Sequence, residues 1–142
     1  MEIEKHIERF IRRHHVLTLA TCAGRNPWCA NMFYAYVPGS QWFVFTSDEA
    51  TRHASDAADN PQVALSVVLE SRIVGRVQGL QVQGRMRRAR GEELETARGA
   101  YLRRFPYAAA ASLTLWIVEP EFVKLTDNTL GFGRKLTAGE PR

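Results

Sequence analysis

The segment that decides the fold is Trp28-Cys29-Ala30-Asn31-Met32-Phe33-Tyr34-Ala35-Tyr36-Val37, followed by Pro38-Gly39-Ser40 and Gln41-Trp42-Phe43-Val44-Phe45-Thr46. Its aromatic and β-branched residues favour extended chain, and the Pro-Gly-Ser tripeptide favours a turn. The segment therefore predicts two strands, over residues 28–37 and 42–46. Because the link between them is short, the strands are expected to be antiparallel neighbours.

A polar corner follows this hairpin. Thr46 and Ser47 end the second strand, and Thr51-Arg52-His53 begins a short helix expected over residues 51–59. Hydroxyl groups, an arginine and the free amides of a helix start are groups that bind phosphate. Together with the aromatic strands, they suggest a cofactor with a phosphate tail and an aromatic head. The alternative is a plain hairpin followed by a capped surface helix.

The rest of the chain supplies further short strands and two more helices. Apolar residues recur at helical spacing over residues 2–14 and 91–105, and extended patterns cover residues 16–22, 63–69, 77–86, 113–118 and 122–126. Pro120 is expected to separate the last two of these strands. The pattern predicts a mainly β protein of the α+β class. Its antiparallel sheet of six or seven strands curls into a small barrel with three flanking helices.

Length and composition indicate a single domain. With 142 residues and 45% hydrophobic content, the chain suits one globular core, and residues 1–136 are expected to form it. Residues 137–142 are expected to be a disordered tail. No apolar run approaches the roughly 20 residues of a membrane span, and the first residues are charged, so a cytoplasmic protein without a membrane partner is expected.

The two cysteines, Cys22 and Cys29, are too few for a disulfide framework and wrongly spaced for a sulfur metal site, so no metal is expected. They lie on either side of the predicted turn at residues 24–26, so we expect them to face each other across a hairpin. In a reducing cytoplasm they are expected to stay unbridged.

Positive charge is concentrated in the second half of the chain. Residues 72–104 contain nine arginines and three glutamates. Such a patch can be a solvated surface, or it can bind a phosphorylated ligand or nucleic acid. Nucleic acid is not expected, because the strand that carries Arg85 and Arg87 offers Gln81 and Gln83 instead of stacking aromatic rings. No hydrolase, NTPase, classical dinucleotide-binding or zinc-protease motif is present.

The order of these elements resembles the FMN-binding split β-barrel superfamily, typified by pyridoxamine 5'-phosphate oxidase. Four motifs are similar to its YhbP-like bacterial branch, and the resemblance spans roughly residues 3–135. The motifs are Trp28-Cys29-Ala30-Asn31, Thr51-Arg52-His53-Ala54, Arg103-Arg104-Phe105-Pro106 and Thr126-Asp127-Asn128-Thr129-Leu130-Gly131-Phe132-Gly133.

The resemblance implies a homodimer with FMN in clefts between two barrels. Thr46 and Ser47 would contact the phosphate or ribityl chain, and Arg52 would form a salt bridge to the phosphate, with Thr51 and His53 beside it. Asn31 would lie near the flavin ring, and further ring contacts are expected from Gln83 and Trp116 of either subunit.

The resemblance further implies a flavin-dependent oxidoreductase, for which a reduced nicotinamide is the expected electron donor. Oxidation of pyridoxamine phosphate is not expected, because the oxidase's phosphate-binding arginine and lysine of the second strand and its C-terminal Arg-x-His motif have no counterpart here. No catalytic acid or base can be assigned. The alternative is a non-catalytic module that stores or senses flavin or heme.

Overall fold

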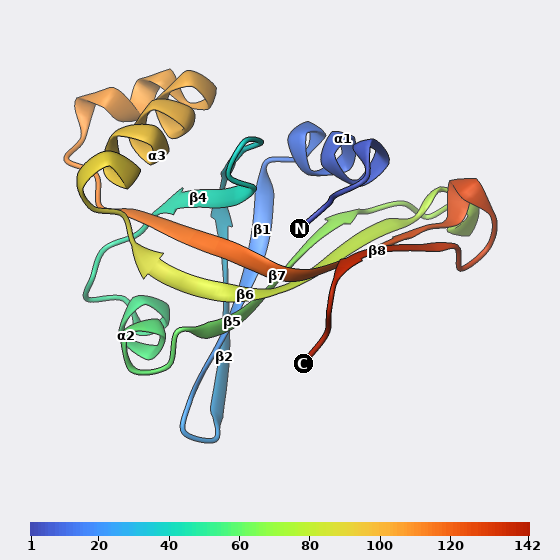
Figure 1. Ribbon diagram of the computed structural model, residues 1–142, viewed down its shortest axis with the longest axis horizontal. Helices are drawn as coiled ribbons and strands as arrows, with labels where there is room; N and C mark the ends of the chain where they lie inside the picture. Colours follow the sequence, from blue (N-terminus) through green and yellow to red (C-terminus); the bar gives the residue numbers. More distant parts are fainter.

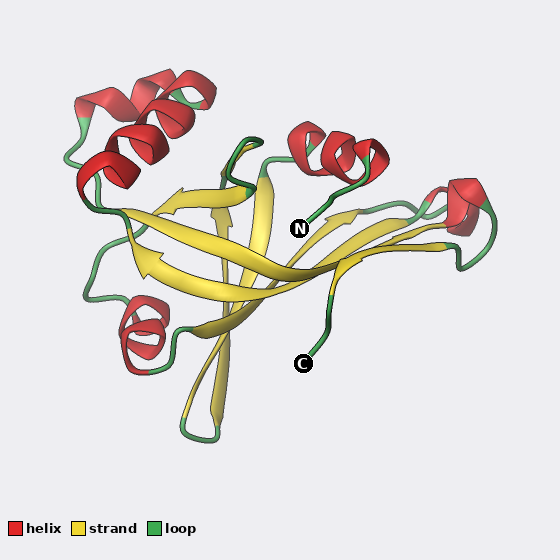
Figure 2. Cartoon of the chain, in the orientation of Figure 1, coloured by secondary structure: helices red, strands yellow, loops and turns green.

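The computed structural model describes residues 1–142 and contains three α-helices and eight strands (Figures 1 and 2). In chain order these elements are α1 (Lys5–Arg13), β1 (Val16–Ala23), β2 (Asn26–Phe33), β3 (Ala35–Val37), β4 (Trp42–Thr46), α2 (Arg52–Asp59), β5 (Gln62–Leu69), β6 (Gln78–Arg88), α3 (Gly91–Arg104), β7 (Leu115–Asp127) and β8 (Lys135–Gly139). Short 3-10 turns cover Val74–Arg76, Pro106–Ala110 and Asn128–Leu130.

All eight strands form one antiparallel sheet in the order β2-β1-β5-β6-β7-β4-β3, and β8 pairs with β7. The sheet curls into a half-barrel (Figure 1). Helix α1 contacts β3, α2 contacts β1, and α3 packs outside β3 and β4. This confirms the predicted fold class. The strand count is eight, where the sequence indicated six or seven.

Tyr34 divides the segment that we expected to be one strand over residues 28–37. Its side chain is fully buried, and its hydroxyl donates a hydrogen bond to the carbonyl of Ile11 at 2.6 Å. The turn inward ends β2, which pairs with β1, and begins β3, which pairs with β4. One tyrosine thus moves the chain from one end of the sheet to the other.

Pro120 does not separate two strands, as we had expected, because β7 runs through it. The register with β6 shifts there: Gln83 lies opposite Phe122 and Gly84 lies opposite Pro120, which leaves Glu121 as the extra residue of a bulge. On its other side, β7 pairs with β4 as far as Val118 and with β8 from Phe122 onward. The missing amide hydrogen of Pro120 therefore falls in the gap between two partner strands.

The expected disordered tail is partly replaced by β8. Thr137 pairs with Lys124, and Ala138 is buried against the core. Without β8, this half of β7 would present an unpaired edge. β8 thus supplies hydrogen-bond partners for the backbone of β7, in a segment where the sequence pattern did not predict a strand.

The main core fills the concave side of the sheet and includes residues of α1 and α2, such as Ile7, Phe10 and Ala57. A smaller core lies between α3 and the β3–β4–β7 part of the sheet. No helix combines the length and the apolar character that crossing a bilayer requires.

Cys22 and Cys29 do not face each other. Cys22 lies opposite Pro27 and Cys29 lies opposite Ala20, and both thiols are free. The symmetry about the turn therefore does not put the two cysteines in register, and the expectation that they face each other was wrong.

Candidate functional site

Three predicted site residues converge where β4 ends and α2 begins. The Oγ of Ser47 lies 2.5 Å from Nε2 of His53 and 3.3 Å from Oγ1 of Thr51. The distance from Thr51 Oγ1 to His53 Nε2 is 3.2 Å. We call this group, with Arg52, the corner; Thr46 is the half-buried last residue of β4, directly before it.

Thr51 is the N-cap of α2, which explains why the chain turns here. Its Oγ1 accepts a hydrogen bond from the amide of Ala54 at 3.4 Å and donates one to the carbonyl of Asp48 at 2.8 Å. The first amides of a helix, those of Arg52 and His53, have no partner within the helix. They add to the positive end of the helix dipole, so the corner offers donors and a field suited to an anion.

Two neighbours hold the side chain of Arg52 in place. Its Cζ lies 4.3 Å from the ring centroid of Trp28 in β2, and its Nε lies 3.7 Å from Oδ2 of Asp56. Asp56 is buried, and the same oxygen accepts a hydrogen bond from Thr21 Oγ1 at 3.0 Å. The side chain of Arg52 remains 48% exposed, so its guanidinium can meet a ligand from solvent.

The surroundings of His53 favour its neutral form. Partial burial lowers the pKa of its imidazole below the ordinary value of 6.5, and the nearby carboxylate of Asp56 opposes this only in part. A neutral ring can donate or accept at Nε2, so it can orient the hydroxyls of Ser47 and Thr51.

Trp116 supports the corner from β7. Its Nε1 donates a hydrogen bond to the carbonyl of Ser47 at 2.8 Å, and the residue is only 7% exposed. The indole therefore holds the end of β4 in place and shows little of its face to solvent.

Asn31 and Gln83 lie on the opposite, convex face of the sheet. Trp28 and Asn31 are three residues apart in β2, so their side chains point to opposite faces. Trp28 lies opposite the buried Thr21, whereas Asn31 lies opposite Thr18 and accepts a hydrogen bond from it at 2.6 Å. Of the three predicted ring contacts, Trp116 thus meets the corner within one chain, whereas Asn31 and Gln83 do not.

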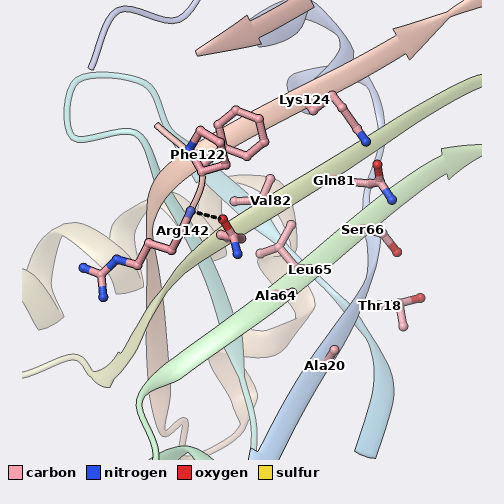
Figure 3. Close-up of a pocket in the computed structure, with 12 residues that line it drawn as sticks. Thr18, Ala20, Ala64, Leu65, Ser66, Gln81, Val82, Phe122, Lys124 and Arg142 are labelled. Atoms are coloured by element: carbon pink, nitrogen blue, oxygen red, sulfur yellow. Dashed lines mark hydrogen bonds between the residues drawn. The ribbon is translucent and has the colours of Figure 1, made fainter. Parts of the chain in front are cut away.

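Gln83 and Thr18 line a pocket of 420 Å³ on this convex face (Figure 3). Residues of successive strands are directly paired, so a transverse row of polar side chains crosses the pocket: Thr18, Ser66, Gln81 and Lys124. Asn31, which lies opposite Thr18, extends this row beyond the pocket. Gln83 lies in the neighbouring row, where its Oε1 accepts a hydrogen bond from the amide of Arg142 at 3.1 Å.

Our sequence reasoning missed Trp28, Asp56 and Thr21 as supports of the corner, and Thr18 and Ser66 as parts of the polar row. The strict alternation of buried and exposed residues in β5 and β6 could have placed the row on one face. No local signal joins Trp28 to Arg52, because their contact depends on how α2 packs against β2.

The corner can hold an anionic group, and the convex pocket can hold a small polar or flat one. Ser47 and His53 are hydrogen-bonded, as a nucleophile and a base would be, but no carboxylate is hydrogen-bonded to the imidazole to orient it, so the pair lacks the third member of a catalytic triad. No three or more His, Cys, Asp or Glu side chains come together in an arrangement that could hold a metal ion.

Comparisons with known proteins agree with this architecture. A family model described as pyridoxamine 5'-phosphate oxidase matches residues 3–127. The UPF0306 protein YhbP of Salmonella arizonae is 39% identical over 130 residues, which cover 92% of this chain and 88% of that protein.

Two solved structures share the fold. An FAD binding protein from Mycobacterium smegmatis has a TM-score of 0.72 and 18% identity, covering 97% of this chain and 98% of that one. A heme binding protein from the same organism has a TM-score of 0.73 and 22% identity, covering 88% of this chain and 52% of that one. The predicted resemblance is confirmed, and the chain belongs to the pyridoxamine 5'-phosphate oxidase family.

Proposed function

We propose that this protein binds FMN, with the flavin phosphate at the corner. The observation that carries the proposal is the convergence of Ser47, Thr51 and His53 within 3.3 Å of one another, beside Arg52 and the start of α2. Two hydroxyls, free amides and a guanidinium match the acceptor oxygens of a phosphate. The pairing of Arg52 with Asp56 at 3.7 Å is loose, so a phosphate can compete for this side chain.

We further propose that the functional unit is a homodimer. A flavin ring that contacts Asn31 and Gln83 cannot belong to an FMN held by the corner of the same chain, because the two groups lie on opposite faces of the sheet. The corner of one subunit and the convex face of a second copy would together make one site. The convex face suits such packing, since the small residues Ala20, Ala64 and Ser66 are exposed there and line its pocket.

The proposed activity is that of a flavin-dependent oxidoreductase. When bound, the flavin supplies the electron chemistry, while the chain orients it and sets the charge around it. The free thiols of Cys22 and Cys29 suit the reducing cytoplasm in which we place this function. The similar proteins described as binding FAD or heme support a flat, conjugated ligand for this chain as well.

Flavin is favoured over heme by one contact. The corner offers one imidazole, and its Nε2 is hydrogen-bonded to Ser47 and Thr51. A phosphate, unlike a heme iron, needs no nitrogen ligand, and it can accept hydrogen bonds from the first amides of α2 and from Arg52.

The test is titration of FMN with the purified protein, followed by quenching of flavin fluorescence. We expect saturable binding with one FMN per chain, and absence of binding would contradict the proposal. Anaerobic stopped-flow absorbance with NADH or NADPH then distinguishes an oxidoreductase from a protein that only stores or senses flavin. Reduction faster than that of free FMN is expected for the oxidoreductase, whereas unchanged reduction would favour a protein that stores or senses flavin.

A further inference from the structure

A groove of 600 Å³ lies next to the corner, between α2 and the end of β6. Its volume lies within the range of small-molecule sites. The groove is lined by Glu49, Ala54, Ser55, Ala57, Ala58, Pro61, Met86, Arg87, Arg88, Arg90 and Trp116. None of these residues except Trp116 was assigned a role from the sequence.

The groove and the corner share a wall. Glu49 lies in the loop between Ser47 and Thr51, and Ala54 directly follows His53 in α2. Trp116 lines the groove while its Nε1 donates to the carbonyl of Ser47 at 2.8 Å. A ligand whose phosphate occupies the corner therefore has the groove as its next neighbour.

Three arginines make the groove positive, and they differ in the number of ion pairs that they form. Arg87 is fully engaged, with Glu93 at 2.7 Å and Glu119 at 2.6 Å. Arg88 forms an ion pair with Glu49, and Arg90 forms none. Arg90 is exposed at the start of α3, so its guanidinium is available to a second anionic group.

The remaining walls are apolar. Ala54 and Ala57 of α2 pack with Met86 and Trp116 in the core beneath the groove, and the exposed Ala58 and half-buried Pro61 complete its apolar lining. Such walls accept a planar base, whose amino group can donate to the carboxylate of Glu49. The groove thus combines a cation, an acceptor and an apolar slot.

We propose that this groove binds the adenosine phosphate half of FAD, so that the protein takes FAD in preference to FMN. The proposal rests on the proposed function, since the flavin phosphate must first occupy the corner. The second phosphate then meets Arg90 and, once it displaces Glu49, Arg88. Adenine lies between α2 and the end of β6.

The experiment measures the dissociation constants of FMN and FAD by isothermal titration calorimetry. It uses the full chain and the variants Arg90→Ala and Arg88→Ala, with Arg98→Ala on the exposed face of α3 as the control. For the unsubstituted protein we expect FAD to bind about tenfold or more tightly than FMN, as one added charged contact would give. Arg90→Ala should remove most of this advantage while leaving FMN binding within about twofold.

Other outcomes separate the two proposals. If FMN binds but FAD binds no more tightly, the groove is not an adenosine site, whereas the corner keeps its proposed role as the phosphate site. An FAD advantage that survives both Arg90→Ala and Arg88→Ala would also overturn the groove assignment. If neither flavin binds, the proposed function itself fails. Thermal unfolding of each variant, expected to match that of Arg98→Ala, shows that the substitutions leave the fold intact.

Discussion

The guanidinium of Arg52 lies over the indole of Trp28, with 4.3 Å between Cζ and the ring centroid. This cation–π contact joins the first turn of α2 to the β1–β2 hairpin. Asp56 pairs with the same guanidinium from the next turn of α2. Arg52 is therefore positioned before any ligand arrives, and less side-chain entropy is lost when a phosphate binds.

Replacing Arg52 is expected to weaken FMN binding more than replacing any other basic residue. Arg52→Ala should cost about 1.5 to 3 kcal/mol, or roughly ten- to more than a hundredfold in the dissociation constant, because a charged hydrogen bond to the phosphate is lost. Fluorescence quenching titration measures this effect. The matched control is Arg98→Ala on α3, and equal affinity for FMN in wild type and Arg52→Ala would remove the corner from the site.

Asp56 is expected to act through Arg52. Asp56→Asn keeps an acceptor for Thr21 but removes the charge that holds Arg52, so FMN should bind about two- to fivefold more weakly, the usual effect of a partly exposed ion pair. Asp59→Asn, at the exposed end of α2, is the control. The same titration on the double variant Arg52→Ala/Asp56→Asn should show no further loss. Additive losses would show that Asp56 has a role separate from Arg52.

Gly84 is expected to be indispensable to the bulge in β7. A Cβ on Gly84 would lie 2.5 Å from the carbonyl oxygen of Glu119, which belongs to the backbone and cannot move aside easily. Gly84→Ala should therefore reduce the free energy of unfolding by roughly 1 to 3 kcal/mol.

The comparison for this variant is Gly79→Ala in the same strand, where a Cβ would meet no atom within 4 Å. Urea denaturation of the two variants should give clearly different midpoints. A Gly84→Ala protein as stable as Gly79→Ala would contradict the close approach of β6 and β7.

The sequence predicted the hairpin, α2 and the corner because each depends on neighbouring residues. Thr51 caps the helix that it begins, and Ser47 lies only six residues from His53. The break at Tyr34 and the passage of β7 through Pro120 depend on distant partners, Ile11 and Gly84, which no local pattern reveals. For the same reason the sequence grouped Asn31 and Gln83 with the corner, although the pleat of the sheet turns them to the other face.

The buried carboxylate of Asp127 is expected to make stability depend on pH in the acid range. Burial alone would raise its pKa, but hydrogen bonds from Thr129 and from His6, at 2.7 Å, outweigh burial and lower the pKa below its ordinary value of 3.8. A group whose pKa is lower in the folded state stabilises the fold above the unfolded pKa. This stabilisation is lost as the pH falls through the folded pKa.

Urea denaturation between neutral pH and about pH 2 measures this contribution. The free energy of unfolding of the wild type should exceed that of Asp127→Asn most strongly above about pH 4, and the difference should shrink below it. A difference that is constant across this range would show that the charge of Asp127 does not contribute. Asp59→Asn again serves as the exposed control.

The most direct test of the account is the crystal structure of the protein with bound FMN. We expect a twofold dimer in which the phosphate lies within hydrogen-bond distance of Ser47, Thr51 and Arg52. The flavin ring should then lie against Asn31 and Gln83 of the second subunit. A phosphate bound away from the corner, or a ring enclosed by one chain alone, would contradict it.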